Sequence, residues 1–127
     1  MTTLYHEELL EHYKYPKNKK AIAHAHFSAH DENPSCGDNL SFEGTIENGI
    51  LTDIGFDGKG CVISQATASM LTDFCLGKPI DELNKLTEED IFKLIQIPLG
   101  PVRAKCATLS LQVLLKGLTL FNSTHLL

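Results

Sequence analysis

The sequence predicts an α+β fold in which a small antiparallel β-sheet of about three strands packs against several α-helices. Three observations predict it: a helical pattern at the N-terminus, alternating apolar residues around a turn signal, and helical apolar spacing through the C-terminal half. The chain has 127 residues, of which 43% are hydrophobic and 21% are charged. Because this length suits one compact core, we expect residues 1–127 to form a single domain.

The first element is a short helix over residues 4–14, where apolar side chains recur among Glu and His at helical spacing. Pro16 ends it, because proline cannot continue a helix. Residues 17–35 are rich in Lys and His and contain Pro34, so we expect irregular or partly extended chain there.

The middle of the chain predicts a β-hairpin. Apolar residues alternate imperfectly over 40–47 and again over 50–56, and Asn48-Gly49 lies between the two runs. Asn-Gly is a strong hairpin signal because both residues tolerate positive φ. After Gly58-Lys59-Gly60, the apolar triplet Cys61-Val62-Ile63 is a candidate third strand.

Helices follow. Ser64 is a plausible N-cap for a helix over 65–76, which we expect to end at Gly77. Residues 79–86 connect it to a second helix, which opens on a capping box variant at residues 87–90.

The last helix is expected to begin at Pro101 and to run to about residue 120. Proline suits a first helical turn because its missing N–H would have no partner there. Pro98 ends the helix before it.

Charge and composition exclude two classes of partner. Lys plus Arg is 11 and Asp plus Glu is 16, so the net charge is 11 − 16 = −5, which disfavours binding to a phosphate backbone. The N-terminus lacks the apolar core of a signal peptide, and no apolar run approaches the roughly 18–20 residues of a membrane span. We expect a cytoplasmic protein that binds neither nucleic acid nor membrane.

Three of the four cysteines lie at the ends of predicted elements. Cys36 follows the turn-forming residues 33–35, Cys61 follows a glycine-rich loop, and Cys106 lies near the start of the last helix. Element ends can direct side chains at a common point, and a helix N-terminus favours a thiolate. Such thiolates can bind metal or act as nucleophiles.

Asp38 stands two residues after Cys36 and could join it on one metal. Three Cys and one Asp would complete a tetrahedral zinc shell, and the same thiolates could hold an iron–sulfur cluster. The gaps of 24 and 44 residues between the three cysteines match no generic zinc pattern, so spacing alone leaves a shared site open.

The segments around these cysteines resemble the iron–sulfur cluster scaffold family of IscU, SufU and the N-terminal domain of NifU. The matching segments are 33–38, 58–69 and 101–106, together with residues 5–18. The resemblance implies the α+β fold and a ligand set of Cys36, Asp38, Cys61 and Cys106. It also implies a protein that receives sulfur from a PLP-dependent cysteine desulfurase, assembles a [2Fe–2S] cluster and passes it to apo-proteins.

Two positions differ from the IscU branch of that family. Lys105 stands where IscU has a histidine before the last cysteine, as in the SufU branch; protonated lysine has no lone pair for a metal, but it can lower the pKa of Cys106. The 44-residue spacing is nevertheless similar to IscU. Residues 99–103 replace the Leu-Pro-Pro-Val-Lys that IscU presents to an Hsp70-type chaperone, which makes that partner doubtful.

The remaining candidates favour ordinary structural roles. Cys75 is expected in the core, because free cysteine is among the most buried residue types. We expect His6 and His12 on a helix surface, and His24 and His26 to be solvated or locally bonded. His30 is the one histidine that could approach the cysteine site.

Several functions are compatible with the sequence. A cluster scaffold comes first. A zinc-dependent sulfur acceptor, in which Cys106 attacks a desulfurase persulfide, is the main alternative. A module with an inert structural zinc is a third, and a Cys–His hydrolase is disfavoured because no histidine lies near a cysteine in the sequence. A carrier is favoured over an enzyme.

Overall fold

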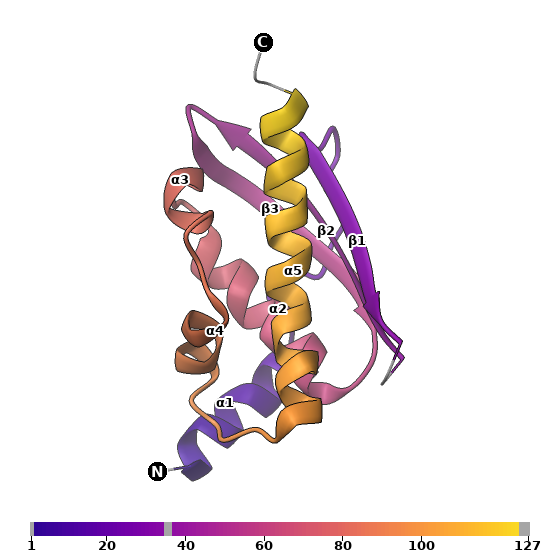
Figure 1. Cartoon of the computed structure of the whole chain (residues 1–127), viewed down its shortest axis with the longest axis vertical. Helices are drawn as coiled ribbons and strands as arrows, with labels where there is room; N and C mark the ends of the chain where they lie inside the picture. The colour runs from indigo at the N-terminus through magenta and orange to yellow at the C-terminus, as the bar shows by residue number, and fades with distance from the viewer. Residues whose placement is uncertain (1, 35–36, 125–127) are drawn as a thin grey trace.

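The computed structural model describes residues 2–34 and 37–124. Three strands form one antiparallel sheet in the order β1-β2-β3, and helices α2 and α5 cover one face of it (Figure 1). In chain order the elements are α1 (Thr2–Lys14), β1 (Phe27–Asn33), β2 (Asp38–Glu47), β3 (Ile50–Lys59), α2 (Val62–Cys75), α3 (Ile80–Leu83), α4 (Glu88–Ile95) and α5 (Pro101–Thr124). The predicted α+β class is confirmed.

The predicted hairpin is confirmed as β2 and β3. Asn48 and Gly49 form its turn with φ of 54° and 75°, so both use the left-handed conformation that the Asn-Gly signal predicts. Along β2, alternate side chains from Asp38 to Ile46 are buried and face the helices. This alternation places Asp38 on the same inner face as the hydrophobic core.

The third strand is β1, and the prediction that residues 61–63 form it is wrong. Cys61 is the N-cap of α2, and Val62 already belongs to the helix. Ser64 is therefore not the N-cap; its hydroxyl donates to the carbonyl of Cys61 at 3.2 Å. β1 lies in the segment expected to be irregular or partly extended, and it pairs with β2 from Phe27 to Asn33.

The later helices follow the sequence signals closely. Gly77, with φ of 81°, ends the turn after α2. Thr87 and Asp90 form the predicted reciprocal capping box of α4. The expected connector contains the single-turn helix α3, and α5 begins at Pro101 as predicted but extends to Thr124.

Within the described residues, the segment Pro101–Ser123 is long and apolar enough to cross a membrane by length and composition alone. This qualifies the expectation that no segment reaches that size. However, 56% of that window is buried inside the fold, and the core helix of a soluble protein meets the same criterion. α5 packs on β1, β2, α2 and α4.

Candidate metal centre

The structure brings together three of the residues proposed as metal ligands. Asp38 is the first residue of β2, Cys61 caps α2, and Cys106 lies in the second turn of α5. The ligand atoms of these three side chains all lie within 4.8 Å of one another. Residues far apart in the sequence therefore converge at the end of the molecule where β2 and α5 begin and β3 ends (Figure 1).

Asp38 holds the Cys61 loop in place. The carboxylate is fully buried. Its Oδ1 accepts a hydrogen bond from the backbone N–H of Cys61 at 2.7 Å, and its Oδ2 lies 3.5 Å from the donating Sγ of the same residue. A carboxylate at the start of a helix is also favoured by the helix dipole. Asp38 thus positions the thiol of Cys61 through two contacts to one residue.

Gly60 makes this contact possible. Its φ is 151°, and a Cβ built on it would lie 2.1 Å from Oδ1 of Asp38. Any side chain at this position would displace the carboxylate. The absence of a side chain also permits close approach of the backbone at Gly58, where a Cβ would lie 2.2 Å from the carbonyl oxygen of Asn39.

The chemistry of the three donors fits a transition-metal ion. Two sulfur donors and one carboxylate oxygen are ligands of Zn²⁺, and cysteine thiolates are the usual ligands of iron–sulfur clusters. Asp38 and Cys106 are buried, whereas Cys61 is partly exposed, so the donor group is accessible from the side of Cys61. These residues could hold a metal ion.

The fourth predicted ligand, Cys36, lies outside the described residues. The chain on both sides of it is placed. Gly37 has φ of 73°, and its N–H donates to the carbonyl of Asn33 at 3.0 Å. Gly37 directly precedes Asp38, so residue 36 is two positions from a donor of the cluster.

Lys105 and His30 are both exposed, unlike the buried Asp38 and Cys106. Lys105 is exposed and lines a hollow of about 260 Å³ together with Asn33, Pro34 and Glu88. It therefore borders the loop that leads to residue 36. His30 is exposed on β1 next to the buried Ala29, which places it on the outer face of the sheet, opposite to Asp38.

Cys75 is confirmed in the core. It is fully buried on α2, and burial raises the pKa of its thiol from 9.0 to about 12, with Lys78 acting weakly in the opposite direction. A reactive thiol needs a lowered pKa, and this buried environment raises the pKa of Cys75 instead. Cys75 therefore has no part in the donor cluster.

One histidine does more than expected. Nδ1 of His12 lies 2.7 Å from Oγ of Ser69, and the backbone N–H of Lys17 donates to the same hydroxyl at 2.7 Å. Ser69 is fully buried, so His12 fastens α1 to α2 rather than only facing solvent. His6 and His24 are exposed, and Nδ1 of His26 accepts from the N–H of Ile46 at 2.9 Å.

Polar residues on the buried face of α2 were missed in the sequence. Gln65 is 7% exposed, and its Oε1 is a buried acceptor without a hydrogen-bond partner among the described residues. The signal was present, because Ser64, Gln65 and Thr67 place polar groups at three of the four positions of one helix turn. A buried polar group without a partner calls for an explanation.

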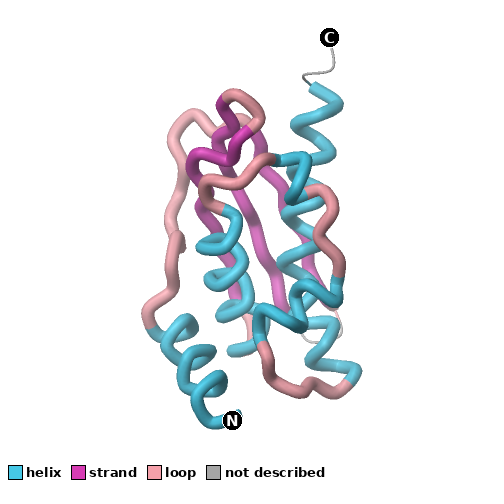
Figure 2. Tube along the Cα trace, turned by 90° about the vertical axis from the view of Figure 1, so that its left-hand side faces the viewer, coloured by secondary structure: helices cyan, strands magenta, loops and turns pink. Residues whose placement is uncertain are grey.

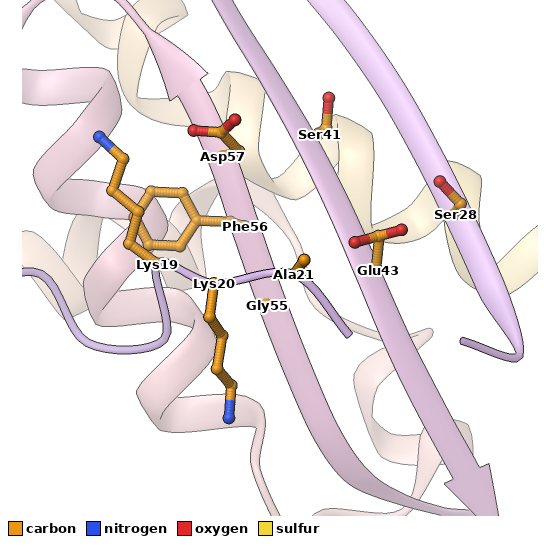
Figure 3. Close-up of a pocket in the computed structure, with 9 residues that line it drawn as sticks. All are labelled: Lys19, Lys20, Ala21, Ser28, Ser41, Glu43, Gly55, Phe56 and Asp57. Atoms are coloured by element: carbon orange, nitrogen blue, oxygen red, sulfur yellow. The ribbon is translucent and has the colours of Figure 1, made fainter. Parts of the chain in front are cut away.

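A second hollow lies on the outer face of the sheet. It has about 650 Å³ and is lined by Ser28, Ser41 and Glu43 from the strands and by Lys19 and Lys20 from the segment after α1. Figure 3 shows the serine and glutamate side chains projecting from neighbouring strands on one face. None of the three donors lines this hollow, so it is separate from the metal centre.

Comparisons with known proteins identify relatives of this chain. A family model described as the NifU-like N-terminal domain matches residues 4–126. The zinc-dependent sulfurtransferase SufU of Bacillus subtilis is 34% identical, covering 92% of this chain and 90% of the relative. The iron–sulfur cluster assembly scaffold protein IscU of Aquifex aeolicus is also 34% identical, over 90% of this chain and 73% of that protein.

A solved structure shares the fold. It is a crystal structure from Fervidobacterium islandicum, named as a scaffold protein of the SUF system, with 25% identity and a TM-score of 0.76 over 88% of this chain and 94% of that one. The family model spans nearly all of the sequence and both curated relatives exceed 30% identity. The chain belongs to the IscU/SufU/NifU N-terminal domain family of iron–sulfur cluster assembly scaffolds.

Proposed function

We propose that this protein is an iron–sulfur cluster assembly scaffold, with Cys36, Asp38, Cys61 and Cys106 as the residues that hold its cargo. In this proposal iron and sulfide are built into a transient [2Fe–2S] cluster, which is then passed to apo-proteins. One observation carries it: the ligand atoms of Asp38, Cys61 and Cys106 converge within 4.8 Å from three separate elements.

The donor set suits a cargo that must leave again. A carboxylate oxygen is a harder donor than a thiolate, so Asp38 holds iron less tightly than a fourth cysteine would. Cys61 is partly exposed, which gives an acceptor protein access to one edge of the cargo. The loop contact between Asp38 and Cys61 keeps two donors positioned before the cargo arrives.

The sulfur is proposed to come from a cysteine desulfurase. A thiolate of this chain, with Cys106 as the first candidate, attacks the outer sulfur of the donor's cysteine persulfide. A new S–S bond forms on this chain while the donor's S–S bond breaks, and the donor cysteine leaves as a thiolate. Lys105, next to Cys106, is proposed to favour the thiolate by its positive charge.

A zinc-dependent sulfurtransferase is the second candidate, and the Bacillus subtilis relative of that name supports it. In this role Zn²⁺ would be held by the same four residues and would keep the thiols deprotonated. Cys106 would accept the sulfur, and no cluster would be built. Both candidates place the protein in the cytoplasm as a single domain that meets a desulfurase. The Hsp70-type chaperone is not part of either proposal.

Anaerobic reconstitution separates the two. The protein is mixed with Fe²⁺, cysteine and a desulfurase, and its visible spectrum is recorded. A scaffold gives sulfide-to-iron charge-transfer bands that are lost in Cys61→Ser and retained in Cys75→Ala, whose cysteine lies outside the cluster.

A different outcome favours the second candidate. If the protein stays colourless, retains one tightly bound zinc and raises the turnover of the desulfurase, the scaffold proposal fails. Mass spectrometry of Cys106 after exposure to the desulfurase then tests the acceptor role, since an inert structural zinc leaves that thiol without a persulfide.

A further inference from the structure

The free edge of β3 is covered along most of its length. The N–H of Leu51 donates to the chain that follows α2 at 3.0 Å, and the N–H of Phe56 donates to the carbonyl of Asn18 at 2.9 Å. Between them, the N–H of Ile54 donates to the carboxylate of Asp53 at 2.9 Å. Figure 2 shows the loop that rises from α1 along the side of the sheet and supplies Asn18. Natural proteins commonly cover sheet edges in this way.

The last part of this edge is open. Alternate residues of an antiparallel strand point their N–H and C=O groups to the same edge, so Gly58 faces the same way as Ile54 and Phe56. No partner is recorded for the Gly58 backbone at this edge among residues 2–34 and 37–124. This open edge ends directly at Cys61.

A basic groove runs along the open edge. It has about 480 Å³, with Gly58 and Gly60 on one side and Tyr13 and Lys14 of α1 on the other. Lys14, Lys19 and Lys59 line it, all three are exposed, and none forms an ion pair within the described part of the chain. Three unpaired cations in a chain of net charge −5 mark a local site for negative charge.

Gln65 supplies an independent sign that a ligand belongs there. It lines the groove and is more than nine-tenths buried. Its amide nitrogen donates to Ser64 at 3.2 Å, whereas Oε1 accepts from no group that the structure describes. A buried acceptor without a donor is destabilising. Oε1 is itself enclosed, so the Gln65 amide must turn toward the groove to accept from an incoming N–H, which would then remove that cost.

We propose that this groove binds an extended acidic peptide segment of a partner protein, which adds as a strand to the β3 edge at Gly58. The backbone of the peptide pairs with the N–H and C=O of Gly58, one peptide N–H donates to Oε1 of Gln65, and acidic side chains meet the three lysines. The inference rests on the groove and the strand edge, and it needs no metal at the donor cluster. Its consequence is that a partner is tethered beside Cys61.

The test uses a short blocked, fluorescent peptide in which Glu and Val alternate. Binding is measured by anisotropy, and exchange of the Gly58 amide proton is measured by NMR. We expect saturable binding and exchange at Gly58 slowed at least about 10-fold at saturation. The double variant Lys14→Glu/Lys59→Glu should weaken binding about 10-fold or more, and Gln65→Leu about 5-fold. Lys85→Glu, a charge reversal of an exposed lysine outside the groove, should leave binding unchanged.

Backbone methylation separates strand pairing from charge attraction alone. Two peptides, each N-methylated at one of the two alternating sets of residues, should differ in affinity, because only one set of N–H groups faces β3. Equal binding by both sets, or exchange at Gly58 that the peptide does not slow, overturns the proposal. The proposal is also overturned if the Gly58 amide is protected from exchange without peptide and loses that protection on dilution, because a second copy of this chain then occupies the edge.

Discussion

Asp38 and Gly60 show how strongly the candidate centre depends on single atoms. The carboxylate of Asp38 occupies the space that a Cβ at residue 60 would need, and the same carboxylate holds the thiol of Cys61. A residue without any ligand atom therefore decides whether a ligand can be placed. The constraint is the space beside the backbone of residue 60, so no residue with a Cβ can replace the glycine without moving Asp38 or the loop.

Gly60→Ala should weaken metal binding. The added Cβ must push Asp38 away or move the loop, so we expect zinc affinity to fall about 10-fold or more, with a loss of about 1–3 kcal/mol in the free energy of unfolding. Zinc competition titration and urea denaturation measure the two effects. Gly77→Ala is the matched control, because residue 77 also has positive φ but its Cβ would meet nothing within 4 Å. Similar zinc affinities for both variants would contradict the role assigned to Gly60.

Cys75 should make stability depend on alkaline pH. Its pKa is raised to about 12 in the fold against 9.0 for an ordinary thiol. Below pH 9 both states keep the proton. Between pH 9 and 12 only the unfolded chain ionises, so stability falls by up to about 1.4 kcal/mol per pH unit. Denaturation of the metal-free protein across this range should show a shallower decline in Cys75→Ala; parallel curves would show that Cys75 does not cause it.

The chemistry of the candidate centre was accessible from the sequence, but its geometry was not. Turn-forming neighbours and positions at element ends identified Cys61 and Cys106, and the place of Asp38 beside Cys36 suggested a fourth donor. Their convergence depends on the register of β2 and on the packing of α5, which no local pattern contains. For the same reason, the exposure of Lys105 and the outward position of His30 emerged only from the structure.

Among the elements, those with a strong local signal formed where expected. The Asn-Gly turn fixed the β2–β3 hairpin and the Thr87 capping box fixed the start of α4. β1 had no such signal, because its sequence alternates weakly and carries three charged or histidine residues; pairing with β2 makes it a strand. The triplet from Cys61 to Ile63 suggested a strand because short apolar runs suit a strand or a helix equally. In the structure, the helix α2 begins there instead, with Cys61 as its N-cap.

The capping box of α4 offers a test at this scale. Thr87→Ala removes the hydroxyl that accepts from the N–H of Asp90, so we expect a loss of about 1 kcal/mol in the free energy of unfolding. A separate, pH-dependent contribution comes from the Asp90 carboxylate: the backbone N–H and then the hydroxyl of Thr87 lower its pKa below 3.8, so the stabilisation from this carboxylate is present above pH 3.8 and is lost as the pH falls further. Denaturant midpoints at neutral and acidic pH measure both. Thr119→Ala, on the exposed side of α5, should change little.

For the whole molecule, the candidate metal centre gathers donors from three separate elements. Its donors come from the start of β2, the cap of α2 and the second turn of α5. The unfolded chain cannot bring these three positions together at a fixed spacing. Binding of a metal must therefore favour the folded state.

Zinc should raise the stability of the protein. At a free zinc concentration about 100-fold above Kd, the free energy of unfolding should increase by about 2.7 kcal/mol. Thermal denaturation with and without Zn²⁺ measures the gain. Cys61→Ser should lose most of it, whereas Cys75→Ala should keep it despite a lower starting stability. An equal gain in both variants would mean that the ion binds elsewhere.

The contact between Asp38 and Cys61 has a further consequence for turnover. Because the carboxylate already accepts from both the amide and the thiol of Cys61, the two groups satisfy each other when no metal is held. An arriving ion must displace the proton of the Cys61 thiol. When the ion leaves, the hydrogen bond between that thiol and Asp38 can form again. The hydrogen bond between Asp38 and Cys61 thus competes with the cargo for the ligand atoms of both residues. This competition lowers the affinity for the cargo below what the donors alone would give. Release of the cargo therefore costs less free energy than it would from a site without this hydrogen bond.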